Sequence, residues 1–266
     1  MKIYHFTKLK NAINILKYGK LNFGNLDYSN DPSEGLYPTK VIENSILNIY
    51  GRGNASRNMI ALFRINTTLN DDLHIYSISF TSKLDEIHNW MEYGNYGEGV
   101  AFEFDFLKLA ILLEKEDKNN SLAIKPVIYS EKKIYNRIKE ICVNSKNDSN
   151  NGEPNVLPTY DVIDLYPIIK NKAYKSEKEL RISFVQGPPS GTIDNKNKLF
   201  LYDSEPEQYY LNVNLLINEK ALVGIHLGSN VTIYEKKNLK DFIRKNKIDI
   251  KIHENYIPIK QKGKKI

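Results

Sequence analysis

The stretch Ile3-Tyr4-His5-Phe6-Thr7 indicates a short strand that runs straight into an amphipathic helix. Thr7 is a suitable N-cap residue for that helix, because its hydroxyl can accept hydrogen bonds from the exposed amides of the first turn. Gly19 is a suitable end, because glycine readily adopts the left-handed conformation that closes a helix. Between them, apolar residues recur on one helical face, at Leu9, Ala12, Ile13 and Leu16. We therefore expect the chain to begin with a strand that carries a histidine to the start of a helix.

Strands and helices then alternate without a regular period. Strand patterns occur at residues 74–81, 100–104, 125–129, 179–185, 198–202 and 222–227. Helical patterns occur at residues 38–63, with an interruption at Gly51-Arg52-Gly53, in a short stretch that holds Trp90, Met91 and Tyr93, and at residues 106–113 and 161–167. Gly97 and Gly99 precede a strand and lack the spacing of a dinucleotide-binding fingerprint, and no P-loop is present. The pattern predicts an α+β fold with a largely antiparallel sheet.

The composition is that of a globular protein, with 41% hydrophobic and 26% charged residues over 266 positions. We expect a single domain over residues 1–266, with a polar mobile loop at 144–155 and a basic C-terminal tail. The net charge of +6 favours an anionic partner such as RNA, DNA or an anionic cofactor. Solvated charge in the tail is an equally good explanation of the excess, since four of the last seven residues are lysines.

Neither a membrane segment nor a metal site is expected. No apolar run is long enough to span a bilayer, and the first residues lack the pattern of a signal peptide, so we expect a cytoplasmic protein. Cys142 is the one cysteine, which excludes an intrachain disulfide and a cysteine-based metal cage. The remaining candidate ligands show no recognised metal spacing, and His226 and His253 are expected to be structural.

The opening stretch resembles the first motif of the ADP-ribosyltransferase-like superfamily, in its histidine branch. This branch includes DarT-type toxins, RNA 2′-phosphotransferases and poly-ADP-ribose polymerases. Positions 3 to about 230 also resemble a large, mostly uncharacterised bacterial family often found near phage-defence and toxin genes. Besides the opening, the shared motifs are Asn30-Asp31-Pro32-Ser33-Glu34-Gly35, Trp90-Met91-Glu92-Tyr93-Gly94 leading to Gly99-Val100, Tyr174 to Arg181, and Ile225-His226-Leu227-Gly228.

The resemblance implies an ADP-ribosyltransferase-like split, largely antiparallel sheet with flanking helices. It also implies a toxin or phage-defence effector that uses NAD to ADP-ribosylate a macromolecule, with nucleic acid slightly favoured over protein. A cognate antitoxin, where one exists, would be a further partner. Two alternatives stay open, namely an NAD glycohydrolase and an inactive module that binds a nucleotide or a partner protein.

Two motifs would supply the chemistry. His5 would donate hydrogen bonds to the adenosine-side ribose of NAD, with Thr7 assisting. Glu179 would be the catalytic carboxylate, because cleavage of the nicotinamide–ribose bond develops positive charge that an anion stabilises. Glu177 would position the acceptor from the same strand face and is the rival for the catalytic role. The structural alternatives are a core histidine and a surface strand of alternating Glu and Lys.

Further cofactor contacts are expected from the middle of the sequence and from the loop at residues 26–35. Tyr93 is the preferred residue to stack on nicotinamide, ahead of Tyr76, Tyr96 and Trp90. Ser79 is a candidate cofactor contact and shares a strand face with Ser77 and Thr81. Simple alternation of polar and apolar residues along the strand would also place the three on one face. Asn30 and Asp31 would contact the cofactor or only form a turn, for which Asn-Asp-Pro is well suited.

Overall fold

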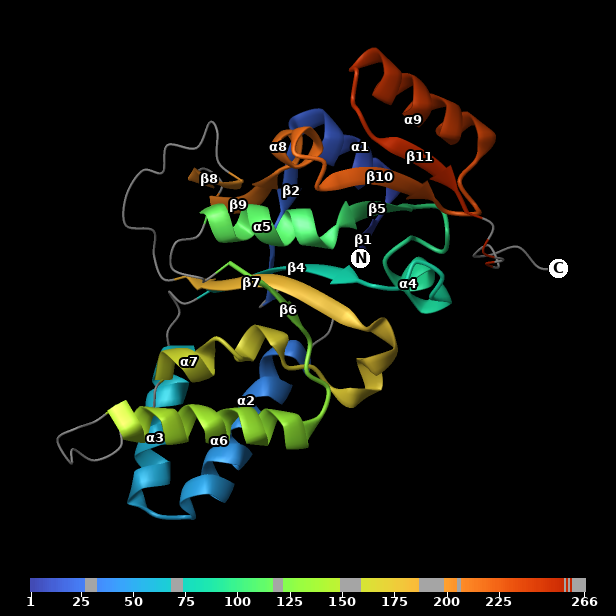
Figure 1. Cartoon of the computed structure of the whole chain (residues 1–266). Coiled ribbons are helices and arrows are strands. Elements are labelled where there is room, and N and C mark those ends of the chain that lie inside the picture. Colours follow the sequence, from blue (N-terminus) through green and yellow to red (C-terminus); the bar gives the residue numbers. More distant parts are fainter. Residues whose placement is uncertain are drawn as a thin grey trace.

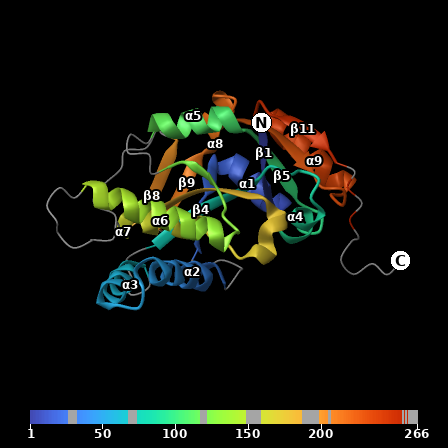
Figure 2. The ribbon, with the colours of Figure 1, turned by 60° about the horizontal axis from the view of Figure 1, so that its bottom comes forward.

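The computed structural model describes residues 1–26, 33–67, 74–116, 122–148, 159–186, 199–204, 207–255, 257 and 259. This part of the chain forms a large, mostly antiparallel sheet with helices on both sides (Figures 1 and 2). The predicted α+β class is confirmed. None of the described helices combines the length and the hydropathy that crossing a membrane requires.

The large sheet has the order β11-β10-β5-β1-β4-β7-β6, and β3 pairs with β4 beside this path. Each pairing is antiparallel except that of β10 with β11, which is parallel. The strands are β1 (Lys2–Thr7), β3 (Gly24–Asn25), β4 (His74–Thr81), β5 (Val100–Asp105), β6 (Ile124–Pro126), β7 (Glu179–Gln186), β10 (Leu222–Leu227) and β11 (Lys251–Glu254).

The sheet forks between β1 and β4. Strand β1 pairs with β5 at six positions, and β4 pairs with β7 at eight, yet β1 and β4 meet at the single pair Tyr4↔Thr81. Beyond this pair, β3 takes over the free edge of β4 through Gly24↔Ser77. The two halves of the sheet therefore diverge, and backbone groups at the fork have to find partners other than a neighbouring strand.

One face of the sheet packs against a second, three-stranded sheet of order β2-β9-β8, together with flanking helices. A buried aromatic cluster joins the two sheets, with Tyr209 at its centre. The added strands are β2 (Lys20–Asn22), β8 (Phe200–Ser204) and β9 (Glu207–Asn212), and the helices are α1 (Leu9–Tyr18), α5 (Phe106–Glu116), α8 (Val213–Asn218) and α9 (Ile233–Lys245).

The other face carries a helical layer with its own hydrophobic core, seen below β4 and β7 in Figure 1. Ile42, Phe63 and Ile134 are completely buried in this core, and Ile75 joins it from β4. The elements are α2 (Ser33–Tyr50), α3 (Asn54–Thr67), α6 (Glu131–Asp148), α7 (Thr159–Ile163) and the 3-10 helices η2 (Tyr166–Ile168) and η3 (Lys172–Glu177).

A short helix, α4 (Ile87–Glu92), lies at the end of β4 and packs Trp90 edge-on against Phe6. Backbones converge tightly just beyond it. A Cβ atom at Gly99 would lie 2.4 Å from the carbonyl oxygen of Thr7, and one at Gly228 would lie 2.1 Å from that of Gly97. Glycine is therefore required at both positions by the close approach of main chains.

Most predicted elements are present, with some corrections. Gly19 ends α1 in the left-handed conformation as expected, but Lys8 occupies the cap position, so the prediction for Thr7 is wrong. Residues 144–148 of the predicted loop continue α6, because the buried stripe of that helix extends to Cys142; residues 149–155 lie outside the described part. The basic tail, residues 260–266, also lies outside it. The sequence patterns did not reveal β2, β3, β9, β11, α8 or α9.

Candidate active site

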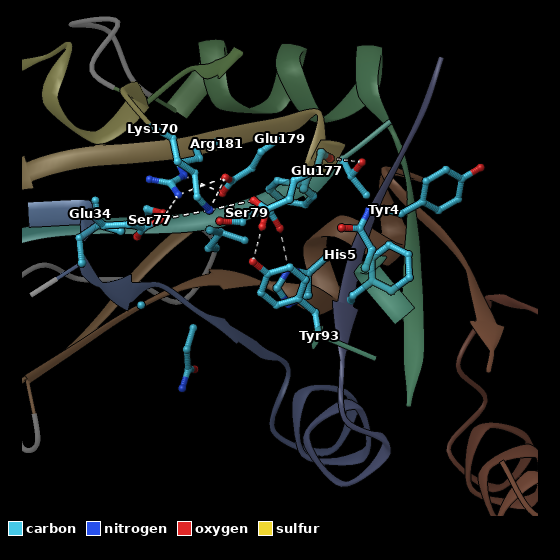
Figure 3. Close-up of a pocket in the computed structure, with 18 of the residues that line it drawn as sticks. Tyr4, His5, Glu34, Ser77, Ser79, Tyr93, Lys170, Glu177, Glu179 and Arg181 are labelled. Atoms are coloured by element: carbon cyan, nitrogen blue, oxygen red, sulfur yellow. Dashed lines mark hydrogen bonds and ion pairs between the residues drawn. The ribbon is translucent and has the colours of Figure 1, made fainter. Parts of the chain in front are cut away.

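A pocket of about 530 Å³ lies at the fork of the sheet. Its walls come from β1, β2, β3, β4 and β7, from α1, α2 and α4, and from the segment that joins η2 to β7 (Figure 3). Its volume is within the range of about 300–1,000 Å³ that is usual for small-molecule sites. The divergence of β1 and β4 is what opens this space.

The polar side chains of the pocket face follow from strand periodicity. Successive residues of a strand point to opposite faces, so residues two apart share a face. On β4, Ile78 and Phe80 pack into the hydrophobic core between the large sheet and the three-stranded sheet. Ser79 and Thr81 therefore point toward the pocket. Arg181 lies opposite Ser79 across the β4–β7 pairing. Polar residues are thus collected on one face of two paired strands, facing the helical layer.

His5 occupies the fork itself. Its Nδ1 lies 2.9 Å from the carbonyl oxygen of Ser79, which β1 would have engaged in an unforked sheet. A carbonyl can only accept, so Nδ1 carries the hydrogen and donates. Burial lowers the pKa of His5 and outweighs the opposing effect of this hydrogen bond, so the ring is neutral near pH 7. Nε2 therefore offers a lone pair and would accept from a ligand hydroxyl, contrary to the donating role expected from the sequence.

Lys170 is the centre of a buried charge network. Its ammonium lies 2.8 Å from Glu177, 3.1 Å from Glu34 and 3.2 Å from Glu179, and the lysine and all three carboxylates are almost completely buried. Burial alone would lower the pKa of Lys170, but the surrounding carboxylates, Glu179 and Glu34 foremost, hold it above its ordinary value. The lysine therefore stays charged and joins α2, η3 and β7 at one point.

Arg181 completes the network. Its guanidinium donates to both oxygens of Glu179, at 2.6 and 3.1 Å, to Glu34 and to the carbonyl oxygen of Pro167. Burial would raise the pKa of Glu179, yet Arg181 and Lys170 hold it below its ordinary value. Three carboxylates against two cations leave one net negative charge in this buried group. The pocket wall is therefore suited to a ligand part that is, or becomes, positively charged.

Glu177 is held more loosely than Glu179. One of its oxygens accepts from Lys170, and the other accepts from the hydroxyl of Tyr93 at 2.9 Å and lies 3.5 Å from Nε2 of His88. Burial raises the pKa of Tyr93, so its phenol stays neutral and donates. Figure 3 shows Glu177 turned toward Tyr93 and His5, and Glu179 turned toward Arg181 and Lys170.

The two glutamates do not share a strand face, which corrects the sequence-based expectation. Glu177 ends η3, Lys178 is left-handed with φ 46°, and β7 begins only at Glu179. The two carboxylates meet because this turn redirects the chain, and both then reach Lys170. The expectation that both acidic groups serve one site is compatible with this geometry, although its stated reason was wrong.

The other predicted site residues separate into three groups. Tyr93 and Ser79 line the pocket, and the Ser79 hydroxyl bonds to Glu179. Thr7 is buried on β1 beside β5, outside the pocket lining. Asn30 and Asp31 lie outside the described residues. The alternatives to Tyr93 are less suitable, since Tyr76 and Trp90 are buried in hydrophobic cores and Tyr96 is absent from the pocket lining.

Sequence reasoning missed Lys170 and gave Glu34 and Arg181 only incidental roles. The available signal was a lysine placed directly after the apolar run Tyr166-Pro167-Ile168-Ile169, where a charge requires a buried partner. Asn89 was also missed. It lines the pocket and is 2% exposed, and its amide nitrogen has no hydrogen-bond partner among the described residues. A ligand acceptor could satisfy this donor.

The comparison with family models matches part of the chain. Residues 89–182 are similar to a family described as a protein of unknown function, DUF2971, which covers less than half of the chain. The matched segment includes most of α4, Lys170 and the Glu177–Arg181 stretch, and thus one wall of the pocket. A search of curated proteins and a search of solved structures each found no match.

Proposed function

We propose that this protein is an NAD-dependent ADP-ribosyltransferase that modifies a macromolecule. The observation that carries the proposal is the forked sheet, which brings a neutral histidine from β1 and a buried carboxylate pair from η3 and β7 into one pocket. The resemblance of the opening stretch to the histidine branch of the ADP-ribosyltransferase-like superfamily, and the split sheet that it implied, support the same reading.

The charges of the pocket suit the chemistry of NAD. The nicotinamide ring of NAD is cationic, and positive charge moves to the ribose carbon as the glycosidic bond breaks and nicotinamide leaves with the bonding electrons. A net negative wall stabilises that developing charge more than it stabilises the ground state. An acceptor hydroxyl or amine then bonds to the ribose carbon and releases its proton to a carboxylate or to water. His5 would accept from a ribose hydroxyl, and Tyr93 would stack on nicotinamide.

The geometry favours Glu177 over Glu179 as the carboxylate that faces the reacting ribose. Both oxygens of Glu179 are held by Arg181, so its charge is already compensated. Glu177 shares Lys170 with two other carboxylates, and its second oxygen is held by the neutral phenol of Tyr93. Glu179 would then orient the network, which reverses the preference drawn from the sequence.

A nucleic-acid acceptor, RNA or DNA, fits the surface next to the pocket. Lys172, Lys175 and Lys178 are all exposed on and after η3, the turn that ends at Glu177. Cations at that place would attract phosphate groups, with an affinity that falls as salt increases. A role as a toxin or phage-defence effector, in the cytoplasm and with a cognate antitoxin as a further partner, belongs to the same proposal.

Incubation of the full chain with NAD labelled in its adenylate part, together with a bacterial lysate, tests the proposal. Label that becomes attached to RNA, DNA or protein supports transfer, and the nature of the labelled band identifies the acceptor. Free labelled ADP-ribose alone would replace the proposal with NAD hydrolysis. If NAD stays unchanged but raises the melting temperature, the protein binds NAD without turning it over, and the proposal is replaced by that of a binding module. The proposal is overturned if millimolar NAD is not turned over and also produces no thermal shift.

A further inference from the structure

Three side chains from neighbouring strands converge outside the pocket. The strands that carry them, β5, β10 and β11, lie at the upper right in Figure 1. They are Glu103 on β5, His226 on β10 and His253 on β11. His226 lies directly opposite His253, and Glu103 lies opposite Gly224, two residues before His226. Residues two apart share a strand face, so all three point to the same side. Their nitrogen and carboxylate oxygen atoms lie within 4.8 Å of one another.

Glu103 and His226 are in direct contact within this cluster. Nε2 of His226 lies 2.6 Å from a carboxylate oxygen of Glu103, and its Nδ1 lies 3.4 Å from the side-chain oxygen of Asn255. A carboxylate offers only lone pairs, so in the metal-free protein Nε2 carries a hydrogen and donates it to Glu103, and a metal ion bound between them would take the place of that hydrogen. Asn255 is placed to hold the far side of the ring, as outer partners of metal-bound histidines do.

His253 supplies a free ligand. Among the described residues its ring has no hydrogen-bond partner, and it stacks on His226 with centroids 4.5 Å apart and an angle of 15°. The absence of a side chain at Gly224 leaves room for this ring, because a Cβ there would lie 3.4 Å from its Nε2. A half-buried histidine whose two ring nitrogens make no hydrogen bond has none to break when it turns toward a metal.

We propose that Glu103, His226 and His253 form a Zn²⁺ site that fastens the edge strand β11 to the sheet. Two imidazoles and one carboxylate are a common zinc donor set, which leaves one position for water. Donors around tetrahedral zinc lie about 3.3 Å apart, so the Glu103–His226 contact would open by roughly 0.7 Å. Lys2 lies 3.4 Å from Glu103 and 3.6 Å from Asp105, so its ammonium can move to Asp105 when the metal enters.

The site lies beside the pocket without belonging to it. Tyr4, which lines the pocket, packs edge-on against His226 with ring centroids 5.6 Å apart. The three ligands come from three strands and are distant in sequence, which is why their spacing gave no metal signal. The proposal does not depend on the pocket's activity, and its test measures zinc directly.

Zinc binding to the metal-free full chain is the test, measured by isothermal titration calorimetry and by thermal shift. We expect one Zn²⁺ per chain and a rise in melting temperature. His253→Gln should fold normally, because His253 has no hydrogen bond to lose, and should lower zinc affinity by roughly a hundredfold or more, since even outer partners are worth 10–100-fold. Glu103→Gln should show a similar loss, and His74→Gln, a strand histidine on β4, should bind zinc as wild type does. Absence of zinc binding to wild type, or equal binding to His253→Gln, would overturn the proposal.

Discussion

Glu177 and Glu179 lie two positions apart, but their surroundings give them different roles. Glu179 is bound by Arg181 through both oxygens, and Glu177 faces Tyr93 and the pocket. We expect Glu177→Gln to lower ADP-ribosyl transfer by on the order of a hundredfold with NAD affinity little changed, because the variant loses an anion but keeps its shape. Turnover of labelled NAD and calorimetric NAD binding measure the two effects.

The paired variant, Glu179→Gln, separates catalysis from support of the network. It should destabilise the fold, because it leaves the buried Arg181 with less compensation. Transfer should therefore fall together with stability. Full activity in Glu177→Gln combined with a stable but inactive Glu179→Gln would return the catalytic role to Glu179.

His5 gives a prediction about pH. Burial lowers its pKa from 6.5, so the neutral, accepting form persists throughout the range above pH 6.5. NAD affinity should be constant from pH 8 to 6.5 and should weaken only at lower pH, as Nε2 gains a proton and stops accepting. Calorimetric titrations with NAD from pH 8 to 5 would measure this, with His5→Ala as the control that binds weakly at every pH. A decline already between pH 8 and 7 would contradict the proposed role.

Among the elements, the connection between α2, η3 and β7 depends on Lys170. Its ammonium contacts Glu34, Glu177 and Glu179 at 2.8–3.2 Å. We expect Lys170→Met to cost about 3–5 kcal/mol of unfolding free energy, because the variant leaves three buried carboxylates with one cation. Urea denaturation gives this value. The control, Lys172→Met, changes an exposed lysine two residues away, and its free energy of unfolding should stay within about 0.5 kcal/mol of wild type. Equal losses of stability in the two variants would show that the network contributes nothing.

The convergence of the segment after α4 with the end of β10 depends on glycine. A Cβ at Gly228 would lie 2.1 Å from the carbonyl oxygen of Gly97, so Gly228→Ala must displace one of the two backbones. We expect a loss of about 1–3 kcal/mol, as in other overpacked sites. Gly53→Ala is the matched control, because nothing lies within 4 Å of a Cβ at that position. Comparable denaturation midpoints for the two variants would contradict this account.

For the whole molecule, the buried network predicts sensitivity to acid. The pKa of Glu179 lies below its ordinary 4.5 in the folded state, so the unfolded chain takes up the proton first as pH falls. The stabilisation is complete above about pH 4.5 and is lost as pH falls through the folded pKa. Melting temperatures from pH 6 to 3 should therefore fall less steeply for Glu179→Gln than for wild type, and parallel curves would contradict the prediction.

Local patterns in the sequence predicted the elements whose burial repeats along a single strand or helix. Strands β4 and β10 were predicted with the observed bounds, and the break between α2 and α3 was placed at Gly51, whose φ is 72°. Alternation and glycine act within a few residues, so they can be read directly. Strand β9 was not predicted, because part of its burial comes from its pairing with β2, which lies far from it in the sequence.

The sequence by itself determined the α+β class and the chemical types of the candidate site, namely a histidine on the first strand and a pair of glutamates near Arg181. Only the tertiary structure decided which groups meet. Glu34 and Arg181 are 147 positions apart, and Lys170 joins the network from the segment between η2 and η3, which has no motif of its own. The physical reason is range. Backbone geometry and side-chain burial act along one element, whereas a buried ion network forms only where the folded chain brings distant charges together and excludes water from them.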